Sequence, residues 1–274
     1  MKVSLILIFA LLLACSKKND VVSHTSDESI ERFTQFSEVV RDTFVINVQV
    51  PYAYFENPDA HYPTAYVLDG NFYFPMMASI LRQYEIAGLL EPTILVAIGY
   101  RSFKEMDSLR TRDYLYPAAL ESDEIETVGG GERFYEFLTE DLLPVIDGKY
   151  RTKPNERALL GHSFGGYFVL YSLMNQLKKK TSTFNKFVSA SPTLWYNDFF
   201  IKDLPQHLKD NSHPLQIFIS AGQREDSIWS VQPVKDLAGV VQKINPKHVE
   251  LKSRIYSHLD HMDVALLSFT KGLQ

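Results

Sequence analysis

Short apolar segments recur along this sequence between stretches of helical periodicity, and this alternation constrains the fold more than any other feature. The segments at 64–68 and 94–99 are apolar almost throughout, as expected for strands buried on both faces of a parallel sheet. Further strands are predicted at 44–50, 158–160, 187–190, 216–221 and 249–256, and helices at 73–90, 132–146, 164–177, 228–244 and 262–273. Strands that alternate with helices are joined by right-handed crossovers. The sequence therefore predicts an α/β fold with a mostly parallel, twisted sheet and helices on both faces.

The N-terminus carries an apolar run that is too short to span a membrane. It extends from Val3 to Ala14, whereas a spanning helix needs about 20 residues. Leu12-Leu13-Ala14-Cys15 resembles the bacterial lipobox, in which the cysteine is acylated and becomes the new N-terminus. We expect a lipoprotein signal peptide over 1–14, a polar tether over 15–38 and one folded domain over 39–274. Lipidation of Cys15 predicts a membrane anchor in the bacterial cell envelope, on the periplasmic or outer-surface side.

The charge balance argues against nucleic acid as a partner. The chain has 28 Lys and Arg against 33 Asp and Glu, a formal net charge of -5, whereas nucleic-acid-binding proteins usually carry basic patches. Cys15 is the one cysteine of the sequence, so neither a disulfide framework nor a thiolate metal site is expected. We expect no metal and no cofactor, because no recognisable ligand spacing occurs. The sequence does not indicate an oligomeric state.

One motif carries recognisable chemistry. Gly161-His162-Ser163-Phe164-Gly165-Gly166 lies where a predicted strand passes into a predicted helix, which is the setting of a nucleophile elbow. The glycines suit a sharp, strained turn in which side chains beside the serine would collide with neighbouring elements. Ser163 is the predicted nucleophile, and a serine that only caps the helix is the simpler alternative. His162 is expected to be a structural part of the turn, because its side chain should point away from Ser163.

A serine nucleophile needs a base, and the base needs a carboxylate that orients it. In a fold with this elbow the chain order is serine, acid, histidine. Glu225 is the first candidate for the acid and Asp226 the second, because both follow the strand at 216–221 at the edge where catalytic groups collect. His258 and His261 follow the last strand. We favour His261 as the base because it adjoins the last helix, which fixes its backbone better.

Two backbone N–H groups are candidates for stabilising the oxyanion of a tetrahedral intermediate. They belong to Phe164, directly after the nucleophile, and to Asn71, in the loop after an earlier strand. Trp195 and Tyr196 are candidates for a substrate pocket, because they follow a predicted strand at the same edge of the sheet. Arg112 is either a substrate contact or, as the simpler interpretation, half of an ion pair with the residue that follows it.

Several motifs in a fixed order resemble a known family, from about residue 40 to the C-terminus. The motifs are Tyr66-Val67-Leu68-Asp69-Gly70, Arg110-Thr111-Arg112-Asp113-Tyr114, Gly130-Gly131-Glu132-Arg133-Phe134, the elbow at 161–166, Ser189-Ala190-Ser191-Pro192-Thr193-Leu194-Trp195 and His261-Met262-Asp263-Val264. Together they are similar to the putative esterase family, which includes esterase D, feruloyl esterases, mycolyl transferases and ferric-siderophore esterases. The resemblance implies an α/β-hydrolase fold. It favours Glu225 and His261 as acid and base, with Asp226 and His258 still open to exchange.

These expectations combine into one functional hypothesis. The chain is expected to be a lipid-anchored serine hydrolase that cleaves carboxylic esters of a small molecule through an acyl-enzyme on Ser163. The resemblance implies siderophore, feruloyl or other acyl esters as substrates. The alternative is a catalytically silent binding lipoprotein that keeps the fold as a scaffold.

Overall fold

The computed structural model describes residues 28–274. The predicted signal peptide, Cys15 and the tether as far as residue 27 lie outside the described residues. Within residues 28–274, no helix is both long and apolar enough to cross a membrane.

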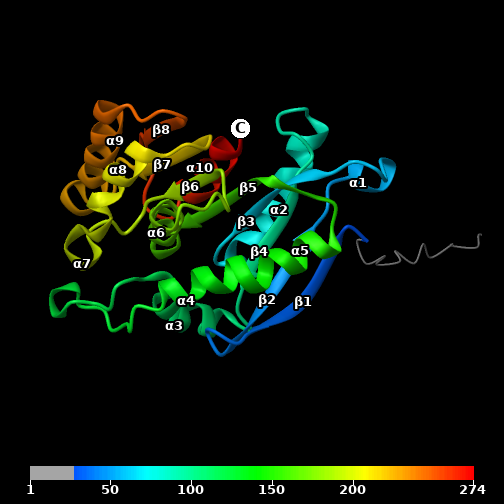
Figure 1. Cartoon of the computed structure of the whole chain (residues 1–274), viewed down its shortest axis with the longest axis horizontal. Coiled ribbons are helices and arrows are strands. Elements are labelled where there is room, and N and C mark those ends of the chain that lie inside the picture. The colour runs from blue at the N-terminus through cyan, green and yellow to red at the C-terminus, as the bar shows by residue number, and fades with distance from the viewer. Residues whose placement is uncertain (1–27) are drawn as a thin grey trace, which may run out of the picture.

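In the described part of the chain, eight strands form one sheet in the order β1-β2-β4-β3-β5-β6-β7-β8 (Figure 1). The pairs β1–β2 and β2–β4 are antiparallel, and all other neighbours are parallel, which confirms the predicted mostly parallel sheet. The strands are β1 (Ile30–Ser37), β2 (Asp42–Gln49), β3 (Tyr62–Val67), β4 (Ile94–Gly99), β5 (Thr152–His162), β6 (Lys186–Ala190), β7 (Leu215–Gly222) and β8 (Val249–Tyr256). The chain order reverses between β3 and β5, the kind of position at which open α/β sheets bind ligands.

Helices cover both faces of the sheet (Figure 1), as the alternation in the sequence predicts. Neighbouring strand residues point to opposite faces, so Leu159 packs in one buried cluster and Leu160 in the other. One face carries α2 (Gly70–Ile86) and α10 (Val264–Leu273), and the other carries α4 (Gly131–Glu136), α5 (Leu143–Lys149), α6 (Phe164–Lys179) and α9 (Gln232–Ile244). Shorter or more peripheral helices are α1 (Ala53–Glu56), α3 (Phe103–Tyr114), α7 (Tyr196–Phe199) and α8 (Leu204–His207).

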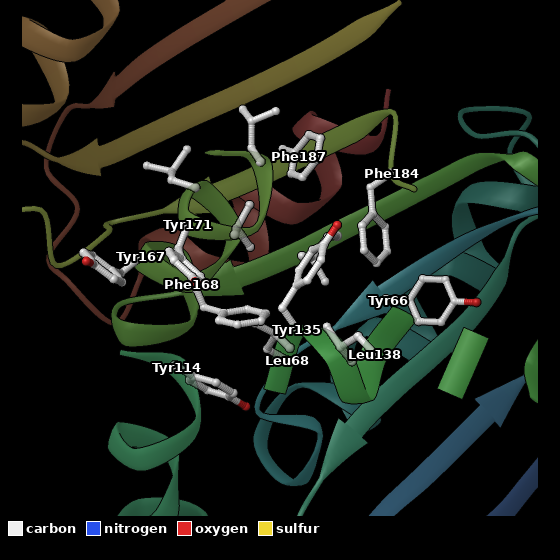
Figure 2. Close-up of a cluster of buried hydrophobic side chains, with 14 of the residues drawn as sticks. Tyr66, Leu68, Tyr114, Tyr135, Leu138, Tyr167, Phe168, Tyr171, Phe184 and Phe187 are labelled. Atoms are coloured by element: carbon white, nitrogen blue, oxygen red, sulfur yellow. The ribbon is translucent and has the colours of Figure 1, made fainter. Parts of the chain in front are cut away.

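An aromatic core holds α6 against the sheet (Figure 2). Phe168 of α6 is fully buried, and its ring centroid lies 5.7 Å from that of Tyr114 and 5.1 Å from that of Phe134. Full burial of an aromatic side chain of this size contributes about 1.5–3 kcal/mol. The N-terminus of α6 carries the predicted nucleophile, so this core fixes its position relative to the sheet.

The structure corrects the predicted tether. Residues Ile30–Ser37 form β1, which pairs antiparallel with β2, so the folded domain begins by residue 30 rather than at 39. The strand lies at the edge of the sheet and is mostly exposed, and for this reason its sequence lacks the apolar alternation of a buried strand. Helix α3 is also absent from the sequence prediction, because its residues are largely polar.

Candidate active site

Ser163 occupies a sharp turn between the end of β5 and the start of α6, with φ 60° and ψ -119°. Such a conformation is strained for a residue with a side chain and costs about 1–3 kcal/mol. A Cβ on Gly161 would lie 2.2 Å from the carbonyl oxygen of Gly165, and one on Gly166 would lie 2.7 Å from that of Ala190. Glycine alone fits these two positions. The backbone therefore has the geometry that the elbow motif predicts.

Glu225 and His261 form a hydrogen-bonded pair. Nδ1 of His261 lies 2.8 Å from Oε2 of Glu225, and the other carboxylate oxygen accepts from the Ser191 hydroxyl at 2.6 Å and from the Gly222 N–H. Burial pushes the pKa of Glu225 up, but the hydrogen bonds from His261, Ser191 and Gly222 outweigh it, so this pKa lies below its ordinary value. Glu225 is therefore ionised at neutral pH. The imidazole of His261 stays 39% exposed, which leaves it accessible to a substrate.

Asp226 and His258, which the sequence left open as alternative acid and base, are not part of this hydrogen-bonded pair. Oδ1 of Asp226 accepts the N–H groups of Ile228 and Trp229, each at 2.8 Å, and so caps the helical turn that follows. His258 is exposed and has a positive φ of 65°. The geometry thus brings together Glu225 and His261, the pair that the sequence favoured.

His162 connects the elbow to the loop of His261. It is 3% exposed, and its Nε2 lies 2.8 Å from the carbonyl oxygen of His261. The centroids of the two imidazole rings are 4.5 Å apart. Because His162 directly precedes Ser163, this contact ties the loop of the candidate base to the elbow.

The two candidate oxyanion donors lie in the first turns of helices. Asn71 belongs to α2 and Phe164 to α6, and within residues 28–274 neither N–H donates to a backbone carbonyl outside its own helix. The Asn71 side chain donates to the carbonyl of Tyr100 at 2.8 Å and accepts the N–H of Tyr100 at 2.7 Å. These two bonds fix the start of α2 against the end of β4. Both N–H groups are free to bind an oxyanion, and their role stays a prediction.

The candidate pocket residues are only partly placed as predicted. Tyr196 is fully buried and donates its hydroxyl to the carbonyl of Pro117 at 2.7 Å, so it does not line a pocket open to substrate. Arg112 donates to Asp113 at 2.8 and 3.0 Å and to Asp42 at 2.9 Å, which is the ion-pair interpretation rather than a substrate contact. Trp195 is half-buried. A residue's place after a strand does not reveal which way its side chain turns, and this explains the error at Tyr196.

Arg110 is a site residue that the sequence reasoning missed. Its guanidinium donates to both carboxylate oxygens of Asp69, at 2.9 and 2.8 Å, and to the carbonyl of His162 at 3.2 Å. It also lies 5.1 Å from the ring centroid of Phe164. Arg110 and Asp69 both occur in the family motifs given above, so the sequence did mark both residues as candidates. Their pairing joins α3 to the start of α2 and to the elbow.

An apolar cavity of about 450 Å³ lies beside the loops that carry the candidate acid. Its lining includes Leu194, three residues after Ser191, and Ile228, three residues after Glu225. A cavity of about 600 Å³ lies at the opposite ends of the parallel strands, where β6, β7 and β8 begin. The second cavity is larger but lies at the edge of the sheet away from Ser163, whereas the first lies at the edge that carries the candidate acid.

Comparisons with known proteins agree with this architecture. The family model described as "Putative esterase" matches residues 37–262. The chain is 33% identical over 183 residues to the ferri-bacillibactin esterase BesA of Bacillus subtilis, over 61% of this chain and 62% of that protein. It is 30% identical over 203 residues to the siderophore enterobactin esterase of Emericella nidulans, over 66% of this chain and 65% of that protein. These matches span less than two thirds of either relative.

Solved structures show the same fold at lower identity. The BES protein from Bacillus cereus superposes with a TM-score of 0.80 at 21% identity, over 98% of this chain and 97% of that one. An IroE-like serine hydrolase from Shewanella oneidensis superposes with a TM-score of 0.75 at 22% identity, over 89% of this chain and 78% of that one. The sheet, the elbow and the family match over most of the chain lead to one conclusion: the chain belongs to the putative esterase family and has an α/β-hydrolase fold.

Proposed function

We propose that this chain hydrolyses carboxylic esters through an acyl-enzyme on Ser163. The observation that carries the proposal is the 2.8 Å hydrogen bond between Nδ1 of His261 and Oε2 of Glu225, beside a serine held in a strained elbow. With the Nδ1–H donating to the carboxylate, the neutral imidazole keeps its lone pair at Nε2. That lone pair can accept a proton from a serine hydroxyl.

The reaction proceeds in two halves. Oγ of Ser163 attacks the ester carbonyl while its proton passes to Nε2 of His261, and the oxyanion is stabilised by the N–H groups of Asn71 and Phe164. The C–O bond to the alcohol then breaks, and the alcohol leaves with the proton from His261. Water next attacks the acyl-enzyme and gives its proton to His261, which returns it to Ser163 as the carboxylic acid departs. Glu225 stays ionised and stabilises the imidazolium in both halves.

The proposed substrate is an ester of a siderophore with an aromatic or other apolar acyl group. One relative is named a siderophore enterobactin esterase and another a ferri-bacillibactin esterase, which supports this class. The apolar cavity beside Leu194 and Ile228 has room for an acyl group. Phe72, at the start of α2, is 36% exposed and contacts the ring of the exposed Phe103, with centroids 6.1 Å apart. Exposed aromatic rings suit stacking against an aromatic ligand.

The first test is turnover by the full chain with and without its nucleophile. Wild type should hydrolyse p-nitrophenyl butyrate, and Ser163→Ala should lose roughly 10⁶-fold in kcat while it keeps its thermal unfolding temperature. A fluorophosphonate should add once, on Ser163, as located by mass spectrometry. Lys247→Ala is the matched control, because Lys247 is exposed and lies before β8, at the end of the sheet opposite Ser163; it should retain wild-type turnover and labelling.

The outcomes separate the alternatives. Turnover with a single adduct on Ser163 supports the hydrolase, and a siderophore ester cleaved faster than a feruloyl ester supports the substrate class. Neither turnover nor an adduct would contradict the hydrolase and favour a silent binding protein. Equal turnover by Ser163→Ala would contradict the proposed nucleophile.

We also propose that Cys15 anchors the protein to a membrane of the bacterial cell envelope. The support is the lipobox-like segment Leu12-Leu13-Ala14-Cys15 after a short apolar run. Replacing Cys15 with Ser should move the protein from the membrane fraction to the soluble fraction, as followed by immunoblotting. Lys18→Ser keeps the cysteine and should stay with the membrane. Retention of the Cys15→Ser variant in the membrane fraction would contradict acylation at this position.

A further inference from the structure

The buried imidazole of His162 makes two hydrogen bonds that the chemistry at Ser163 does not itself require. Its Nδ1 lies 2.9 Å from the hydroxyl of Tyr73, which comes from α2 on one face of the sheet. Its Nε2 lies 2.8 Å from the carbonyl oxygen of His261. Both partners are far away in sequence, 89 and 99 residues respectively. The ring therefore joins three separate elements of the active site.

The carbonyl of His261 fixes the tautomer of this ring. Burial above all, together with the neighbouring His261 and Arg110 side chains, lowers the pKa of His162 to about 3. The ring is thus neutral at neutral pH and carries one N–H. A backbone carbonyl can only accept, so the N–H must be on Nε2 and must donate to His261. Nδ1 then accepts the hydroxyl hydrogen of Tyr73.

The loop that carries His261 needs such a contact. Residues 257–263 are largely exposed, and the imidazole of His261 itself is 39% exposed. Among residues 28–274, two other hydrogen bonds reach the loop from outside it: the N–H of Arg224 donates to the carbonyl of Leu259 at 3.1 Å, and Nδ1 of His261 pairs with Oε2 of Glu225 at 2.8 Å. The bond from Asp260 to the N–H of His261 is internal to the loop. His162 directly precedes Ser163, so its bond to the carbonyl of His261 joins the backbone of the candidate base to the elbow.

We propose that His162 is a positioning residue, which sets the place of His261 relative to Ser163 by donating from Nε2 to the carbonyl of His261, while the hydroxyl of Tyr73 donates to Nδ1 and holds the orientation of the ring. This inference rests on the proposed ester hydrolysis. His162 touches none of the reacting atoms and acts through His261. A misplacement of about 1 Å between reacting groups can cost about 100-fold in rate, so loss of this positioning should have an effect of up to that size.

Three replacements of His162 separate this role from simple space filling. Gln places an amide N–H near the position of Nε2, Asn places one near Nδ1, and Met fills the space without a donor. Gln should restore most of the activity, within about fivefold of wild-type kcat. Asn and Met should each lose roughly 10- to 100-fold in kcat with little change in KM. Thermal unfolding of all three, measured in parallel, shows whether the activity merely follows stability.

Tyr73→Phe tests the orientation of the ring. With His162 present, loss of the hydroxyl leaves Nδ1 without its donor and lets the imidazole turn away from the carbonyl of His261, so kcat should fall several-fold. The amide of Gln has no acceptor near the position of Nδ1, so Tyr73→Phe should change kcat less than twofold in the His162→Gln background. Equal effects in the two backgrounds would overturn the role of Tyr73.

Nitrogen-15 NMR of the imidazoles gives a readout that does not depend on turnover. Wild type should show His162 as the neutral Nε2–H form at pH 5, and the His261 signals should shift in His162→Met but stay near wild type in His162→Gln. Equal activity and unchanged His261 signals in all three variants would overturn the proposal, as would activity that follows unfolding temperature alone. An inactive wild type would instead contradict the proposed function, and the NMR comparison would still decide the positioning role.

Discussion

Glu225 and Asp226 are neighbours in sequence, yet they act on different groups. Glu225 points inward, with its side chain 2% exposed and bonded to His261. Asp226 bonds two backbone N–H groups at the start of the next helical turn. A carboxylate that orients a base and one that caps a helix need different surroundings, and here one peptide unit separates them. Residue type alone therefore does not identify the acid.

A pair of isosteric substitutions tests this division. Glu225→Gln removes the charge that stabilises the imidazolium and should lower kcat roughly 10³- to 10⁴-fold. Asp226→Asn keeps a good helix cap and should change kcat less than about threefold, which makes it the matched control. Steady-state hydrolysis of p-nitrophenyl butyrate measures both. The reverse ranking would assign the acid to Asp226.

His162 marks the limit of prediction at the scale of single residues. The motif identified Ser163, and the position of His162 beside it suggested a structural role. Its partners Tyr73 and His261 lie 89 and 99 residues away, and nothing in the local pattern points to either. A hydrogen bond across the fold depends on how β5, α2 and the last loop pack. Such a contact becomes visible only in three dimensions.

At the scale of elements, burial determines what the sequence reveals. β4 is buried throughout and β3 at every residue except Pro63, and their apolar runs predict both strands to within two residues. β1 lies at the edge with most of its side chains exposed, so its pattern resembles a polar tether. Helix α3 has no strong apolar stripe, although Ser102 caps it by accepting the N–H of Glu105 at 3.1 Å. A cap signal of this kind was present in the sequence and could have identified the helix.

The elements also explain why the elbow was predictable and the pocket was not. The turn at Ser163 depends on steric limits close in sequence, since a Cβ on Gly161 would meet Gly165. The glycines of the motif therefore indicate the turn directly in the sequence. The direction of Tyr196 instead depends on contacts with Pro117, almost eighty residues earlier. Local constraints can be inferred from local sequence, whereas the lining of a cavity depends on elements that meet from different parts of the chain.

For the molecule as a whole, the buried neutral His162 links folding to pH. Its ordinary pKa of 6.5 falls to about 3 in the fold. Between these values the unfolded chain binds a proton that the folded protein does not, so folded stability falls as the pH decreases below about 6.5. Each pH unit in this window costs about 1.4 kcal/mol for one such group. Glu225 has its pKa lowered from 4.5, so its contribution is lost only at more acidic pH.

Urea unfolding at pH 7 and pH 5 should therefore show how much His162 contributes to the pH dependence of the free energy of unfolding. Wild type should lose about 2 kcal/mol more between these pH values than His162→Gln, because the unfolded variant has no imidazole to protonate at that position. Gln206→Ala changes an exposed residue that carries no titratable group and should keep the pH dependence of wild type. The other histidines are common to all three proteins and cancel in the comparison. Equal losses in wild type and His162→Gln would mean that His162 accepts a proton within the folded protein, and its fixed neutral tautomer would then be wrong.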